Sequence, residues 1–280
     1  MAKTKREYVL ASCFLSGAAA IISFVALGTQ EWVTSDVAND IDGNVNPNEY
    51  VKIGLFGGVF HQETGTYATF ELSTVCAWDL NICAFLCGDD VEDNLRILYN
   101  NEKLPSNYDT SCAKISAADT EVRRITPRAS EDNTEKIFLN TGMWFCTILF
   151  LLISGIMGVF SAGLAIWNTA TNPHQVYLSI FGLYIYNAIA FFTVLLPIAL
   201  WGAAFAQDLR YNIPSYKTFD QGFVTKDHAQ LGYSYWINLA SLFLYAVSIC
   251  LLYVRNYLIS KEPKVNLELE ENADPVIYLY

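Results

Sequence analysis

Long uncharged stretches dominate the hydropathy pattern of this chain of 280 residues. No Asp, Glu, Lys or Arg occurs from Tyr8 to Gln30, from Ile137 to Gln207 or from His228 to Val254, which are windows of 23, 71 and 27 residues. About 20 apolar residues are enough to cross ~30 Å of hydrocarbon. The middle window is long enough for two crossings, and the polar stretch 167–175 divides it. The pattern therefore predicts four membrane-spanning helices.

The spans divide the chain into helices, loops and tails. We expect the helices at 8–30, 137–166, 176–206 and 233–257. The other segments are an N-terminus at 1–7, loops at 31–136, 167–175 and 207–232, and a tail at 258–280. The first uncharged run continues well past Ala18-Ala19-Ala20, which favours a retained helix over a cleaved signal peptide. Buried helices of a large soluble core are the alternative, but such a core rarely contains 71 consecutive residues without a charge.

Basic residues near the helix ends predict the orientation in the membrane. Lys3, Lys5 and Arg6 precede the first helix, and Arg255 and Lys261 close the last one. Because Lys and Arg are enriched on the cytoplasmic side, we expect both termini and the short middle loop in the cytosol. The two longer loops then lie outside, and the plasma membrane is the expected location.

The long loop 31–136 carries most of the charge. It holds 19 acidic and 8 basic residues, a balance of −11 that equals the net charge of the whole chain. It also holds Cys76, Cys83, Cys87 and Cys112, four of the seven cysteines. Four cysteines allow three disulfide pairings, among which the sequence does not choose. A zinc site is the alternative, although spacings of seven, four and twenty-five lack the close pairs of common zinc modules. An oxidising compartment favours disulfides, and we expect them to connect a strand region to a helical region.

Within this loop, residues 50–60 and 67–75 have the composition of two strands. Val91, Leu95 and Leu98 follow at helical spacing. The stretch 117–135 is polar and is expected to be the loosest part. The predicted fold is therefore an all-α membrane protein, a four-helix bundle with a large disulfide-bonded extracellular loop that contains a small β region.

Small residues recur every four positions in two of the expected helices, a pattern that lets helices approach closely. They are Ser12, Ser16 and Ala20 in the first helix and Ser154, Gly158 and Ala162 in the second. Trp32 follows the first helix, where an indole suits the membrane interface.

Enzymatic, transport and nucleic-acid functions have little support in the sequence. His61, His174 and His228 lie in different loops, and the chain has no G-x-S-x-G, H-E-x-x-H or phosphate-loop motif. We therefore expect neither catalysis nor a cofactor, a metal or a nucleic-acid partner. Coupled transporters place ionisable residues inside their helices, whereas Asn187 and Asn238 are the strongest polar residues here, and interhelical hydrogen bonds explain them.

Several short motifs, in order along the chain, resemble the clarin family within the claudin-like tetraspan superfamily. The first helix closes with Ala26-Leu27-Gly28-Thr29-x-x-Trp32, and the long loop contains Gly54-Leu55-Phe56. Gly182-Leu183-Tyr184 falls in the third helix, and Tyr235-Trp236 begins the fourth. The long loop exceeds the length expected of a clarin, and the chain has no Asn-x-Ser/Thr glycosylation site.

The resemblance implies a non-enzymatic protein that organises membrane, junctional or actin-rich structures, as clarins do in sensory cells. The expected partners are membrane lipids and other membrane proteins or further copies of this chain. A channel or an auxiliary channel subunit is the alternative. The sequence ends in Pro275-Val276-Ile277-Tyr278-Leu279-Tyr280. Tyr278 and Tyr280 suit a PDZ scaffold, which would bind this tail as an added strand.

Overall fold

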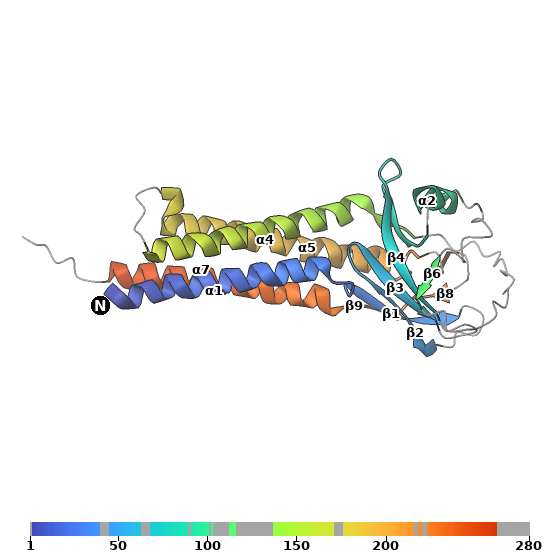
Figure 1. Ribbon diagram of the computed structural model, residues 1–280, viewed down its shortest axis with the longest axis horizontal. Helices are drawn as coiled ribbons and strands as arrows, with labels where there is room; N and C mark the ends of the chain where they lie inside the picture. The colour runs from blue at the N-terminus through green and yellow to red at the C-terminus, as the bar shows by residue number, and fades with distance from the viewer. Residues whose placement is uncertain are drawn as a thin grey trace, which may run out of the picture.

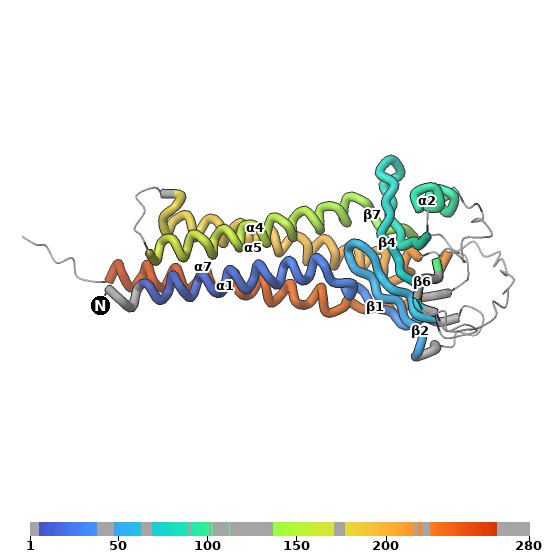
Figure 2. The backbone as a smooth tube through the Cα atoms, viewed as in Figure 1, coloured from blue at the N-terminus to red at the C-terminus, as the bar shows by residue number. Residues whose placement is uncertain are grey.

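Long helices form an elongated antiparallel bundle with a β-sheet at one end (Figure 1). The computed structural model describes residues 2–39, 45–62, 68–88, 91–100, 102, 112–115, 137–170, 176–215, 218–219 and 223–261. The bundle helices are α1 (Ala2–Gly28), α4 (Thr141–Ala170), α5 (Ile180–Ala204) and α7 (Tyr233–Ser260). We call the end of the bundle that carries the sheet the sheet end. The start of α1 and the end of α7 lie at the opposite, terminal end (Figure 2).

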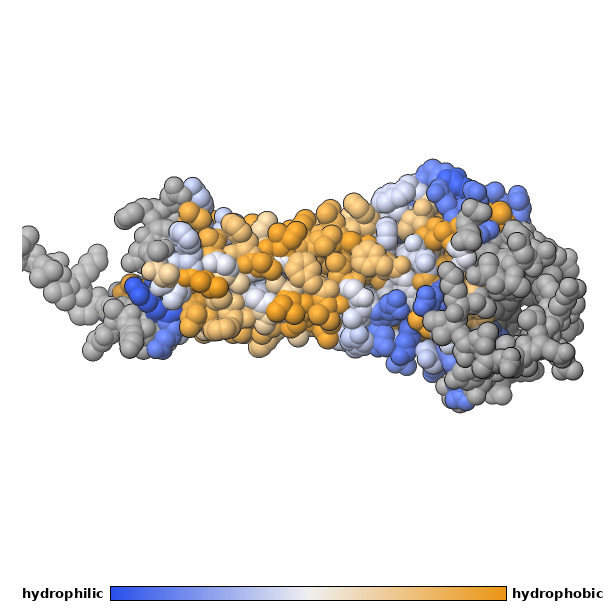
Figure 3. Space-filling model, in the orientation of Figure 1, coloured by the Kyte–Doolittle hydropathy of each residue, from blue (hydrophilic) through white to orange (hydrophobic). Residues whose placement is uncertain are grey.

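The helices have the length and composition of membrane spans. Among the described residues, four segments are long and apolar enough to cross a membrane, namely Arg6–Gly28, Thr141–Ala170, Ile180–Leu209 and Tyr233–Ser260. An apolar surface follows the bundle, and hydrophilic surface flanks it (Figure 3). The chain is therefore a multi-pass membrane protein by the length and composition of its helices, as the hydropathy pattern predicts.

Only the start of the fourth helix, Tyr233, is where the sequence predicted it, and the other helix boundaries differ by two to six residues. The second span begins at Thr141 rather than at residue 137, because Leu139–Asn140 forms the short strand β7. The third begins after a 3-10 turn, η1 (Val176–Leu178), and continues past Ala204 as a π-helical turn, η2 (Phe205–Leu209). Both changes occur where the helix meets other elements.

The small-residue positions lie inside the bundle, as predicted. Ser16 and Ala20 of α1 are fully buried. A Cβ atom built on Gly158 of α4 would lie 2.9 Å from the Cβ of Ala20 and even closer to the hydroxyl oxygen of Tyr245. The absence of a side chain at Gly158 therefore allows α1, α4 and α7 to meet.

The β region is much larger than predicted. Among the described residues, nine strands form one sheet in the order β7-β5-β4-β3-β2-β1-β8, with β6 paired to β4 and β9 paired to β1. The strands from the long loop are β1 (Val33–Asn39), β2 (Val45–Ile53), β3 (Gly57–Gln62), β4 (Ala68–Ala77), β5 (Ile82–Leu86) and β6 (Ala113–Ile115). The loop between α5 and α7 contributes β8 (Phe223–Val224) and β9 (Ala229–Leu231). Both loops therefore build one domain, and the all-α description is wrong in this respect.

The local predictions within the long loop have mixed outcomes. The strand expected at 50–60 is two antiparallel strands, because the chain turns at residues 54–56 between β2 and β3. The strand expected at 67–75 corresponds to β4. The helix is confirmed as α2 (Val91–Tyr99), in which Leu95 and Leu98 are buried. The stretch 117–135 lies outside the described residues.

Candidate functional site

The sheet is joined to the sheet end of the bundle by buried indole rings and hydrogen bonds, and we call this region the junction. Trp32, directly after α1, is fully buried there. Its indole Nε1 donates to the Ala26 carbonyl at 2.8 Å, and its backbone N–H donates to the Ile53 carbonyl of β2 at 2.8 Å. Its ring meets Trp201 of α5 edge-on, with 5.3 Å between centroids. The prediction of a membrane-interface position is therefore wrong, because this indole joins α1, the sheet and α5.

The Gly54-Leu55-Phe56 motif is the turn that seats the sheet on the helices. Gly54 donates its N–H to the Gly57 carbonyl at 2.7 Å, which closes the turn. A Cβ atom on Gly54 would lie 2.5 Å from the Thr29 carbonyl oxygen, so only glycine permits this approach to the end of α1. Leu55 is fully buried, whereas Phe56 is 55% exposed.

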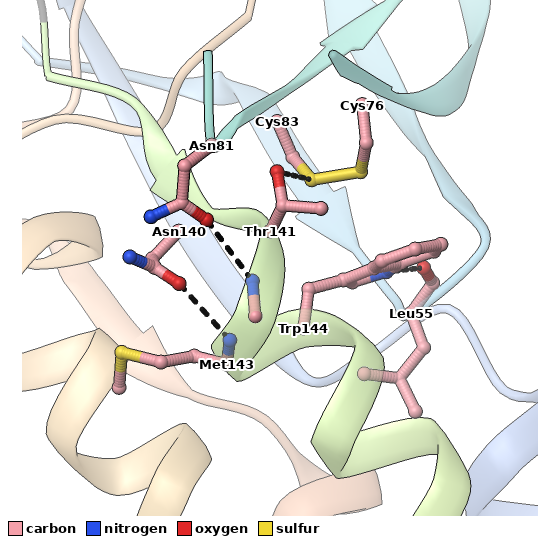
Figure 4. The surroundings of a disulfide bond; sticks show 9 residues. Leu55, Cys76, Asn81, Cys83, Asn140, Thr141, Met143 and Trp144 are labelled. Atoms are coloured by element: carbon pink, nitrogen blue, oxygen red, sulfur yellow. Dashed lines mark hydrogen bonds between the residues drawn. A yellow bond between two sulfur atoms is a disulfide. The ribbon is translucent and has the colours of Figure 1, made fainter. Parts of the chain in front are cut away.

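The first turn of α4 is held by side chains from both the helix and the sheet (Figure 4). The Asn140 Oδ1 atom accepts the Met143 N–H at 3.1 Å, as an N-cap does. The Asn81 Oδ1 atom, from the turn between β4 and β5, accepts the Gly142 N–H at 3.4 Å. The Trp144 indole donates to the Leu55 carbonyl at 2.6 Å. An N-cap contributes about 1 kcal/mol, and here the capping also fixes the sheet relative to α4.

The four cysteines of the long loop form disulfides, Cys76–Cys83 and Cys87–Cys112. Cys76 and Cys83 face each other in the register of β4 and β5. The Thr141 hydroxyl lies 3.4 Å from the Cys83 sulfur and donates to it, because a disulfide sulfur has no proton (Figure 4). The second bridge joins the end of β5 to the residue before β6, and α2 lies within its loop. The first bridge joins two paired strands, unlike the expected strand-to-helix connection, whereas the second connects the end of β5 to Cys112, which has helical backbone geometry.

Ion pairs lie at the periphery of the junction. Arg96 of α2 donates to both Asp79 carboxylate oxygens, at 2.7 and 3.0 Å, and to Glu92 at 3.2 Å. The hydrogen bond from Arg96 lowers the pKa of Asp79. Lys52 donates to Glu31 at 2.8 Å, and this bond raises the pKa of Lys52. Exposed pairs of this kind contribute little to stability, so they orient α2 and β2 more than they stabilise them.

A second polar cluster lies inside the bundle, in the half of the helices nearer the terminal end. Asn187 of α5 donates to the Ser161 hydroxyl of α4 at 2.6 Å, and its Oδ1 accepts from Ser248 of α7 at 3.2 Å. The Ser248 hydroxyl lies 2.7 Å from that of Ser12 in α1. This chain of bonds links α1, α4, α5 and α7, which confirms an interhelical role for Asn187. Asn238 differs, because its amide donates to the Ser234 carbonyl of its own helix.

The Gly182-Leu183-Tyr184 motif is not part of the junction. Gly182 and Leu183 are buried near the start of α5, and Leu183 packs in a small cluster at the terminal end with Val9 and Leu252. Tyr184 packs against the same cluster. The tail positions Tyr278 and Tyr280 lie outside the described residues. Within the part of the chain that the structure describes, no group of three His, Cys, Asp or Glu residues could hold a metal ion.

Sequence reasoning missed most of the residues that build the junction. Asn140 directly before an apolar run is an N-cap signal, and it could have placed the start of α4 correctly. Asn81 has a positive φ of 55°, a conformation that Asn tolerates better than most residues. Trp144 and Trp201 carry no local signal, because their partners are distant in the sequence.

The fold defines a class: a four-span membrane protein whose two loops at one end of the bundle form a single disulfide-bonded sheet. No protein-family model and no curated protein matches the chain. The resemblance to clarins therefore rests on the short motifs alone, and what it implies belongs to the proposal below.

Proposed function

We propose that this protein is a non-enzymatic, clarin-like organiser of membrane assemblies, which acts through the surfaces that it presents on either side of the bilayer. The junction carries this proposal. The sheet is held to α1, α4 and α5 by buried indoles and backbone hydrogen bonds. A domain fixed in this way has a defined position relative to the membrane, which suits a scaffold that orients its partners.

The interior of the bundle supports a structural function. Among the described residues, the buried polar side chains of the membrane-spanning helices are Ser, Thr and Asn. The large side chains of Trp201, Tyr245 and Leu151 fill the space between these helices. Because carriers and pumps use ionisable groups within their spans, this packed and uncharged interior favours a static bundle.

A channel or auxiliary channel subunit is the second candidate. The acidic loop 31–136, with its balance of −11, would concentrate cations near a pore entrance. Since the interior of one chain is filled, a pore would need several copies around a shared axis. The proposed organiser needs no such assembly.

The proposed orientation places the sheet outside the cell and both termini in the cytosol, at the plasma membrane. The basic residues at the N-terminus and after α7 support it. The disulfides support it as well, because they persist in oxidising compartments. The proposed partners are membrane lipids and other membrane proteins or further copies of this chain.

The organiser and the channel are distinguished by recording from purified protein in planar bilayers. We expect no conductance above that of protein-free bilayers, over a range of protein densities that covers monomers and oligomers. Cation-selective currents that grow with protein density and vanish in Gly158→Leu protein, which cannot pack its bundle, would support the channel instead.

The proposed cytosolic partner is a PDZ scaffold, bound by the tail through Tyr278, Tyr280 and a free carboxylate on Tyr280. A peptide of residues 262–280 is expected to bind a PDZ panel with micromolar affinity, roughly 8 kcal/mol. One glycine added after Tyr280 displaces the carboxylate from its backbone donors and should abolish binding. Fluorescence polarisation measures both peptides, and equal binding with and without the glycine would refute the PDZ proposal.

A further inference from the structure

Exposed aromatic side chains surround the sheet end of the bundle. Phe56 lies in the turn that contacts the end of α1, and Phe145 lies on the second turn of α4. Tyr211 follows η2, and Tyr233 and Trp236 begin α7. All are more than a third exposed, whereas Trp32 and Trp201 of the junction are fully buried. Aromatic residues gather at the level of the lipid headgroups in membrane proteins.

The spacing along the helices agrees with a bilayer that begins at this level. Exposed aromatic residues also occur near the terminal end, at Trp167 in α4 and Tyr257 in α7. At 1.5 Å per residue, Phe145 and Trp167 are ~33 Å apart, and Trp236 and Tyr257 are ~32 Å apart. Both spacings are close to the ~30 Å of the hydrocarbon layer, so the aromatic rings at the two ends mark its two boundaries.

A further ring at this boundary comes from the sheet, as that of Phe56 does. Trp78 opens the turn between β4 and β5, residues 78–81, and is 61% exposed. Its ring meets that of Phe145 edge-on, with 5.4 Å between centroids. Phe145 lies ~6 Å along the axis from the first residue of α4. The Trp78 ring therefore lies at the level of the first turns of α4, and the turn projects to the side of the bundle (Figure 1).

The turn is held firmly in this position. The Cys76–Cys83 bridge closes its two strands, and the Asn81 carbonyl and side chain both accept bonds from the start of α4. Asp79, next to Trp78, is paired with Arg96 of α2. This pairing neutralises the carboxylate that would otherwise face the headgroup phosphates. Beside α4, Trp78 thus presents an exposed indole on a firmly held turn, and the charge of the neighbouring Asp79 is compensated by Arg96.

We propose that the β4–β5 turn is a lipid anchor, in which Trp78 inserts between phospholipid headgroups and holds the sheet domain at a fixed tilt against the membrane. The occupant is lipid rather than protein because the indole continues the lipid-facing surface of α4 through Phe145. Trp78 combines an apolar ring with an N–H donor, which suits the boundary between acyl chains and headgroups. The Cys76–Cys83 disulfide and the Asn81 hydrogen bonds fix the turn relative to the sheet and to α4, so the anchored turn also holds these elements in place.

The test uses the full chain in phosphatidylcholine liposomes with bromine atoms on the acyl chains. Subtracting the fluorescence of Trp78→Phe protein from that of the unchanged protein isolates the emission of Trp78. We expect this emission to lose most of its intensity to bromines near the headgroup, less to bromines near the chain ends, and little to iodide in the water. Trp236→Phe is the matched control, because Trp236 lies on a spanning helix at the same boundary.

Each other outcome would overturn the proposal. Strong quenching of the Trp78 emission by iodide and none by bromolipid would place the turn in water. Resistance to both quenchers would mean that protein, such as a second copy of the chain, covers it. Size-exclusion profiles and intact disulfides in the Trp78→Phe protein establish that the variant is folded.

Discussion

Gly158→Leu is expected to prevent the bundle from assembling. A Cβ atom at this position would lie 2.9 Å from the Ala20 Cβ and in closer contact with the Tyr245 hydroxyl. That hydroxyl donates to the Ser154 carbonyl at 3.1 Å, so neither neighbour can move without breaking another interhelical contact. Overpacking lowers the free energy of unfolding by about 1–3 kcal/mol even for smaller additions. Because Gly158 lies where three helices meet, we expect a leucine there to cost at least the upper limit of this range.

The melting temperature of detergent-solubilised protein, followed by size-exclusion chromatography, measures this effect. Gly163→Leu is the matched control on the same helix, because a Cβ atom there would meet nothing within 4 Å. It should leave the elution profile and the melting temperature unchanged. If Gly158→Leu protein were as stable as the control, the packing of α1, α4 and α7 described here would be incorrect.

Loss of the loop cysteines is expected to retain the protein in the endoplasmic reticulum. A chain-entropy estimate for the loops of 25 and 7 residues is ~3.5 kcal/mol for Cys87–Cys112 and ~2.4 kcal/mol for Cys76–Cys83. Cys112→Ser should therefore reduce surface delivery more than Cys76→Ser, and the variant without all four cysteines should be retained completely.

Surface biotinylation, together with fractionation of plasma membrane from endoplasmic reticulum, measures the delivery of these variants to the cell surface. Cys250→Ser is the control, because this cysteine is exposed on α7 and free. Normal surface delivery of the variant without the four loop cysteines would show that neither disulfide is needed for folding.

The features that sequence patterns predicted are those set by local composition. Helices in a membrane must satisfy their own backbone groups, so uncharged windows are enough to locate four spans. The amphipathic spacing of Leu95 and Leu98 was enough to locate α2. The small-residue stripes were interpretable because close helix contact requires small side chains, as Gly158 shows.

The sheet was underestimated because its pairings are distant in sequence. Strand β1 pairs with β9, so that Val33 lies opposite Leu231, a residue of the other loop that follows α4 and α5 in the sequence. Strands as short as β7 and β8 carry too few residues for an alternating pattern. The same reason applies to the junction. Trp32 after a span has the pattern of an interface residue, and only its packing against Trp201 shows that it is buried.

The disulfide pairing also depended on tertiary structure. Strand β5 was not predicted from the sequence, so the register that places Cys76 opposite Cys83 could not be inferred. The single strand expected at 50–60 has a related cause, since the buried Leu55 between Gly54 and Phe56 continues an apolar run across the turn from β2 to β3.

Epitope accessibility tests the central claim, a bundle that crosses the membrane with its sheet domain outside the cell. The variants carry one epitope tag after Met1, near Asn44 in the long loop or after Tyr280. On intact cells, antibody should bind only the tag near Asn44, because the proposed orientation places the other two in the cytosol, where antibody reaches them only in permeabilised cells. Antibody staining of either terminal tag on intact cells, or of the Asn44 tag only after permeabilisation, would contradict this account.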